Sequence, residues 1–166
     1  MSYGMAREGL GYTAPEIAKW FINATDREAG DSITHLKVQK LVYYAQGWAL
    51  ALLQRPLFDE DLMAWTHGPV ARTVYDNYRG NGFDALPPQK RTRKIGGDAA
   101  LLLESVNEKY CVFSAKQLER MTHNEIPWKE TRGDLPLLAR SELPILKDTM
   151  ESFFLKMAAR GNKKKQ

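Results

Sequence analysis

The sequence predicts a mainly α fold: a single compact domain of about six helices around one central buried helix, with at most a small two-stranded β element. Three observations predict it. Residues 36–53, LKVQKLVYYAQGWALALL, are apolar at helical spacing and around most of the circumference, which is typical of a helix buried on most sides. Two capping boxes, Thr13–Glu16 and Ser114–Gln117, mark the starts of other helices. Helical segments also outnumber the strand candidates.

The first third of the chain is expected to form two helices. One starts at the Thr13 box and runs to about Asp26, and Thr34 is the predicted N-cap of the central helix. Gly47 lies in the middle of that central helix, where glycine costs about 1 kcal/mol relative to alanine. We therefore expect another backbone to approach closely at this point.

A short segment and a third helix follow. Residues 62–66 are expected to be extended. Pro69 suits a first helical position, because its missing N–H has no partner there. Residues 69–79 are therefore expected to be helical, with Gly80-Asn81-Gly82 as the stop.

The second half is expected to begin with a flexible basic loop over 84–97. Helices are predicted over 98–109 and from the Ser114 box, and a polar stretch with one proline follows at 122–128. Residues 129–142 are weakly patterned. The last helix is predicted over 144–157.

The net charge of +4 arises from basic residues that cluster in two segments of the chain. Eight basic residues lie in the loop and in the tail: Lys90, Arg91, Arg93, Lys94, Arg160, Lys163, Lys164 and Lys165. The rest of the chain is mildly acidic. We expect a flexible N-terminal arm (1–12), a helical domain (13–159) and a disordered basic tail (160–166). The two basic segments suggest a nucleic-acid-binding regulator as the alternative function, but no aromatic residues alternate with the basic ones, which disfavours nucleic acid.

Other classes are excluded by composition. The N-terminus has no apolar run typical of a signal peptide, and no stretch is apolar enough to span a membrane. The single cysteine, Cys111, allows no internal disulfide. A cytoplasmic protein without membrane contact is expected.

No catalytic, metal or cofactor motif is present. The histidines and the cysteine lack metal-ligand spacing, and there is no glycine-rich phosphate loop or GxSxG elbow. Cys111, beside Tyr110 and Val112, is expected to be a small buried hydrophobe. An enzyme would require His123, Glu125 and Cys111 to converge in one pocket. We expect no enzyme and no cofactor.

Two segments are unusual for an ordinary helical domain: Trp65 to Val70 and Thr122 to Trp128. Each combines a tryptophan and a histidine with a proline. Such residues can pack as a rigid cover on the core, or they can form a recognition surface, because tryptophan is enriched in binding hot spots. The candidate partner-binding residues are Trp65, His67, His123 and Trp128.

The motifs in these regions also resemble a known family. They are LKVQKLVYYAQGWAL, PLFDEDLMAWTHGPVARTVYDNY and LERMTHNEIPWKETR, with markers at Leu41, Tyr43, Tyr44, Ala45, Gly47, Leu57, Phe58, Ala64, Trp65, Gly68, Pro69, Val70, Val74, Tyr75, Thr122, His123, Pro127 and Trp128. Over about residues 13–157 the sequence resembles the Panacea domain of phage-associated GepA-like or SocA-like antitoxins. Ala49 and Thr66-His67 depart from the family pattern.

The resemblance implies a function. It implies an antitoxin of a bacterial or prophage toxin–antitoxin pair, which neutralises a cognate toxin by direct protein binding. The SocA-like branch further implies a proteolytic adaptor that delivers the toxin to the ClpXP protease. The partners implied are thus a toxin and a ClpXP-type protease.

Overall fold

The computed structural model describes residues 7–90 and 93–164. Within these ranges there are seven α-helices, one 3-10 turn and three strands, and no helix is long and apolar enough to cross a membrane. In chain order they are α1 (Ala14–Ala24), α2 (His35–Leu52), β1 (Leu62–Trp65), β2 (Gly68–Ala71), α3 (Arg72–Tyr78), η1 (Arg79–Asn81), α4 (Gly97–Tyr110), α5 (Ala115–His123), α6 (Ile126–Arg132), β3 (Pro144–Ile145) and α7 (Lys147–Lys164). The mainly α prediction is confirmed.

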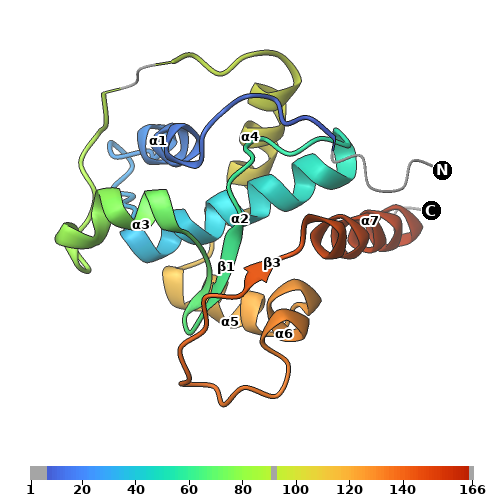
Figure 1. The fold of residues 1–166 in the computed structure, drawn as a ribbon. Coiled ribbons are helices and arrows are strands. Elements are labelled where there is room, and N and C mark those ends of the chain that lie inside the picture. The colour runs from blue at the N-terminus through green and yellow to red at the C-terminus, as the bar shows by residue number, and fades with distance from the viewer. Residues whose placement is uncertain (1–6, 91–92, 165–166) are drawn as a thin grey trace.

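Helix α2 is the centre of the molecule. Its residues 38–51 are all buried, and it packs against α1, α3, α4, α5, α7 and β2. Figure 1 shows α2 crossing the middle, with α1 and α4 on one side and α5 and α6 on the other. The dense apolar pattern of 36–53 predicted this position. The two capping boxes and the Thr34 N-cap form as predicted.

The polar residues inside α2 hold other segments against it. Gln39 accepts a hydrogen bond from the Ala71 N–H (2.9 Å) and donates one to the Ala71 carbonyl (3.3 Å). Gln46 accepts from the N–H of Leu57 and donates to the carbonyl of Phe58, both at 2.8 Å. Buried polar groups are tolerated when they are paired in this way. A helix with so much apolar surface thus also fixes the end of β2 and the loop at Leu57 and Phe58.

Gly47 does allow a close approach, but to a side chain and not to a backbone. A Cβ at this position would lie 2.1 Å from Cε2 of Phe154 on α7. The Phe154 ring is fully buried and packs edge-on against Trp48, with ring centroids 5.1 Å apart. The glycine therefore makes room for the main contact between α2 and α7.

The sheet was only partly predicted. β1 pairs antiparallel with β2 (Ala64 opposite Pro69) and with β3 (Leu62 opposite Ile145), in the order β2-β1-β3. The predicted helix start at Pro69 is wrong, because 68–71 form a strand and α3 begins only at Arg72. Proline is tolerated in an edge strand, where its missing N–H is not needed. The limit of two strands is also wrong.

Two helix boundaries differ from the prediction. The polar stretch at 122–128, for which no helix was predicted, belongs mostly to two helices, because α5 continues to His123 and α6 begins at Ile126 with Pro127 in its first turn. The last helix begins at Lys147, since residues 144 and 145 pair with β1. It continues to Lys164, so the tail predicted to be disordered is helical up to that residue.

The described parts of the N-terminal arm and the basic loop contact the body. The N–H of Leu10 donates to the carbonyl of Pro56 (2.8 Å), and the N–H of Leu86 donates to Ile33 (2.8 Å). Arg93 donates to the carbonyl of Gly11 (2.7 Å). Residues 1–6, 91–92 and 165–166 of the predicted arm, loop and tail lie outside the described residues.

Candidate functional site

The two segments singled out in the sequence lie against each other. Trp128, at the start of α6, donates from Nε1 to the carbonyl of Trp65 at the end of β1 (2.7 Å). The His123 ring stacks on Trp128, with centroids 4.1 Å apart and an interplanar angle of 20°. The Trp65 ring packs on Tyr75 of α3 (4.8 Å). Trp128 is buried and His123 is half-buried, so these contacts support the fold at this corner.

His67 is the most exposed of the four predicted residues. It lies in the turn between β1 and β2, and its Nδ1 is 2.7 Å from Oε1 of Glu119 on α5. Burial alone would raise the pKa of Glu119, but hydrogen bonds from His67 and Lys116 lower it. Glu119 is therefore ionised at neutral pH and holds the hairpin turn to α5. Burial lowers the pKa of His123, which is neutral at pH 7.

Lys40 lies directly beneath this turn. It is fully buried on α2 and donates from Nζ to the carbonyl of Pro69 (3.2 Å). Burial lowers its pKa to about 7, opposed by the charge of Glu119. A Cβ on Gly68 would lie 2.7 Å from Lys40 Cε and 2.8 Å from Thr122 Oγ1, and the φ of Gly68 is +109°. Glycine is required here for both space and conformation.

Glu125 connects the α5–α6 corner to α2. Its carboxylate accepts hydrogen bonds from the hydroxyls of Tyr43 (3.0 Å) and Tyr44 (2.9 Å). Burial raises its pKa to about 7, although both tyrosines lower it. Such a carboxyl binds a proton at a higher pH than an exposed glutamate does. Its two partners identify it as an anchor of the corner.

The groups considered for catalysis do not share a site. Cys111 is exposed at the end of α4, which corrects the prediction that it is buried. It lines a surface depression together with Asp31 and Lys37, whereas Glu125 is held by two tyrosines and His123 by Trp128. Among the described residues, no three His, Cys, Asp or Glu side chains form a group that could hold a metal ion.

Arg132 extends the corner to the loop between α6 and β3. Its side chain is almost fully buried, and the guanidinium lies 5.0 Å from the Trp128 ring centroid. Nη1 donates to the carbonyl of Ala64 (3.1 Å). Nη2 faces three carbonyls of the loop, those of Pro136 (2.9 Å), Leu137 (3.1 Å) and Ala139 (2.8 Å). One side chain thus fixes a loop that has no regular secondary structure of its own.

The part of the loop that Arg132 fixes is a tight turn with two leucines at its tip. The N–H of Ala139 donates to the carbonyl of Pro136 (2.9 Å). Leu137 and Leu138 lie between them and are 60% and 81% exposed. We call residues 136–139 the leucine turn. Turn tips normally carry Gly, Asn, Asp or Ser, so two exposed leucines are unusual.

Sequence reasoning missed the leucine turn. Residues 129–142 lack helical or strand periodicity, but the run Leu135-Pro136-Leu137-Leu138 between polar residues was a visible signal. In Figure 1 this segment is the orange loop that projects beyond α5 and α6, away from α1 and α4. The leucine turn thus combines a projecting backbone with exposed apolar side chains.

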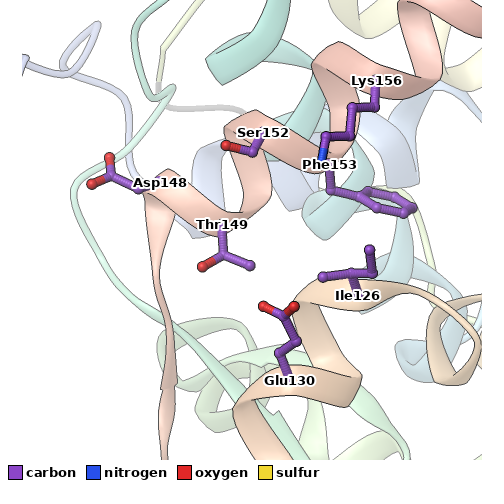
Figure 2. Close-up of a pocket in the computed structure, with 7 residues that line it drawn as sticks. All are labelled: Ile126, Glu130, Asp148, Thr149, Ser152, Phe153 and Lys156. Carbon is purple, nitrogen blue, oxygen red and sulfur yellow. The ribbon is translucent and has the colours of Figure 1, made fainter.

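A shallow groove of about 280 Å³ lies nearby, between α6 and α7. Figure 2 shows Ile126 facing Phe153 across it, with Glu130 and Asp148 on its rim. Lys156 lies beside Phe153. The groove therefore combines two facing apolar side chains with polar and charged residues around them, including Thr149 and Ser152. It is a second surface on which a protein could bind.

Comparison with known protein families identifies the family of this chain. Residues 38–129, from α2 to α6, match the family described as antitoxin SocA-like, Panacea domain. The chain belongs to this family. The comparisons with curated proteins and with solved structures find no match. Membership of the Panacea family supports an antitoxin role, and an antitoxin implies a toxin as partner.

Proposed function

We propose that this Panacea-domain protein is an antitoxin that neutralises its toxin by binding it directly. Family membership carries the proposal. Direct binding is supported by exposed apolar side chains near the α5–α6 corner, at the leucine turn and at Ile126.

The binding surface includes the hairpin turn and the loop that follows α6. Of the predicted residues, His67 is exposed there and can contact a partner. His123 and Trp128 hold the corner from inside, and Trp65 packs beneath Arg72 with the guanidinium 5.9 Å from its ring. A standard interface buries roughly 800 Å² on each partner, so it would extend beyond His67 alone.

Delivery of the toxin to a ClpXP-type protease is the more specific form of this proposal. An adaptor needs a second surface, away from the toxin. The end of α7 is suited to it because it carries the exposed basic residues Arg160 and Lys163. Deletion of residues 161–166 should leave toxin binding intact and should abolish only protease-dependent loss of the toxin.

The alternative, a nucleic-acid-binding regulator, is weakened by the contacts that the partly exposed Arg93 makes with the N-terminal part of the chain. Its guanidinium donates to Gly11, lies 4.5 Å from the Tyr12 ring centroid and is within 3.9 Å of a Glu16 oxygen. A gel-shift titration tests this alternative, since phosphate-driven binding weakens steeply as salt is added. Tight binding with that salt dependence would favour the regulator.

The deciding experiment expresses the product of the adjacent reading frame alone and together with this protein. We expect growth arrest when the neighbouring gene product is expressed alone and normal growth when both proteins are expressed. We also expect the two proteins to co-purify. If the neighbour is harmless, or if rescue occurs without any complex between the two proteins, direct neutralisation is wrong. Repeating the rescue in cells without ClpX separates the two forms of the proposal: occlusion persists there, and delivery for proteolysis fails.

A further inference from the structure

We infer that the leucine turn is the element by which this antitoxin inserts into its partner, with Leu137 and Leu138 entering an apolar pocket on the partner protein. The inference rests on the proposed function and assigns it a surface. Three observations support it: the exposure of the two leucines, the way in which the turn is held, and the charges beside it.

The exposure of these leucine side chains to water is unfavourable unless a partner buries them. Leu137 and Leu138 are 60% and 81% exposed, and Leu135, two residues earlier, is 40% exposed. Single exposed leucines are common on protein surfaces, but clustered apolar side chains mark interaction sites. Three within four residues of a projecting loop form such a cluster.

The turn is held rigidly, although its sequence does not favour a turn. Arg132 contacts the carbonyls of Pro136, Leu137 and Ala139, and Thr66 donates from Oγ1 to the Ala139 carbonyl (3.3 Å). The backbone is therefore fixed before any partner arrives. A preorganised loop loses little conformational entropy on binding, which increases affinity. An apolar loop that served only as a connection would not need a buried arginine.

The neighbouring charges indicate the kind of partner. Asp134 and Arg140 flank the turn, both are exposed, and neither forms an ion pair within the described part of the chain. The charges of these two exposed side chains cancel, and the buried guanidinium of Arg132 is turned toward backbone carbonyls. A lipid surface or a nucleic acid would favour a basic rim. One charge of each sign instead fits a protein pocket with a basic group opposite Asp134 and an acidic group opposite Arg140.

The turn also lies outside the residues that match the family. The match ends at 129, just before Arg132. Arg132 and the turn that it holds lie outside the matched residues, whereas Ala64 and Thr66, which they contact, lie within them. An element of this kind can determine which partner a given member binds, because specificity is a difference in affinity between partners.

The experiment measures binding of the purified product of the adjacent reading frame by calorimetry. The double variant Leu137→Ala/Leu138→Ala is compared with Leu101→Ala, a leucine of similar exposure (63%) on α4. We expect the double variant to bind about 100-fold more weakly, or about 2.8 kcal/mol at 1.4 kcal/mol per tenfold change, and Leu101→Ala to bind like the unaltered chain. Both leucines are exposed, so the fold is retained, which circular dichroism verifies.

The outcomes distinguish failure of the proposed antitoxin function from failure of the binding role given to the leucine turn. If the unaltered chain neither rescues growth nor binds, the proposed function fails, and the inference fails with it. If the unaltered chain binds and the double variant binds equally well, only the inference is wrong. Loss of binding in Ile126→Ala but not in the double variant would place the partner in the α6–α7 groove instead. Leucine-dependent dimerisation, or sedimentation with phosphatidylglycerol vesicles, would likewise overturn it by identifying a second copy or a membrane as the occupant.

Discussion

Replacement of Arg132 by lysine tests how the loop after α6 is held. The guanidinium is buried and reaches four backbone carbonyls. Nη2 faces three of these carbonyls but has only two N–H bonds to donate. About three full hydrogen bonds therefore form. Lysine keeps the charge but not the planar fork, so it can retain about one of these bonds. Hydrogen bonds from a charged group contribute at least about 1.5 kcal/mol each, so the loss of two lowers the free energy of unfolding by about 3 kcal/mol.

Two measurements check this value. Urea unfolding should show the lower free energy, and the melting temperature should fall by about 6–12 °C, since about 1 kcal/mol corresponds to 2–4 °C in a domain of this size. Amide hydrogen exchange should quicken at Leu135 and Ala139, whose N–H groups donate within the loop, to Arg132 and Pro136. The control is Arg120→Lys, an exposed arginine on α5, which should change stability by less than about 0.5 kcal/mol. Equal stability and equal loop exchange in Arg132→Lys and the unaltered protein would refute the role given to the guanidinium.

Three further predictions concern α2 and its neighbours. Gly47→Ala should destabilise the protein by about 2 kcal/mol in urea unfolding, because the new Cβ would lie 2.1 Å from the buried Phe154 ring, whereas Gly80→Ala, where an added Cβ meets no atom within 4 Å, should be nearly neutral. Burial lowers the pKa of Lys40 to about 7, so between pH 7 and 10 the unfolded chain binds more protons than the folded chain. The free energy of unfolding should therefore rise with pH in this range, by up to about 1.4 kcal/mol per pH unit. Lys40→Met should remove this rise, and an unchanged pH profile in that variant would contradict the prediction. Burial raises the pKa of Glu125 to about 7, so between pH 4.5 and 7 the folded chain binds more protons than the unfolded chain. The free energy of unfolding should therefore fall with a similar slope as the pH rises from 4.5 to 7. Glu125→Gln should flatten this part of the stability profile, and persistence of the slope in that variant would assign the slope to other groups.

Local signals in the sequence predicted the elements that depend on local chemistry. The Thr13 and Ser114 capping boxes form because each joins residues only three positions apart. The burial of α2 followed from its own apolar residues. These features need no knowledge of the rest of the chain.

Features that depend on distant partners were missed. β2 forms because residues 68–71 meet β1 and because Gln39, 32 residues earlier, bonds both backbone groups of Ala71. Pro69 gives the same sequence signal at a helix start and in an edge strand. Cys111 is exposed at the end of α4, although Tyr110 beside it is buried against Tyr44, and its neighbours in the sequence do not reveal this difference.

The contacts among the candidate partner-binding residues were foreseen only in part. The sequence pointed to Trp65, His67, His123 and Trp128, and the structure brings their segments together. Arg132 was overlooked because it bonds to backbone carbonyls, one of them 68 residues away, and carbonyls leave no trace in a sequence. The leucine turn was overlooked for the same reason, since its conformation depends on that arginine.

The polar side chains of α2 have a consequence for how partners can be recognised. Gln39 occupies both backbone groups of Ala71, Lys40 occupies the carbonyl of Pro69, and Pro69 itself has no N–H to offer. At the opposite border of the sheet, Pro144 likewise lacks a donor. These contacts and the two prolines remove backbone donors and acceptors from the edges of the sheet, which disfavours addition of a foreign strand and edge-to-edge aggregation. Contact through side chains is therefore favoured over strand addition.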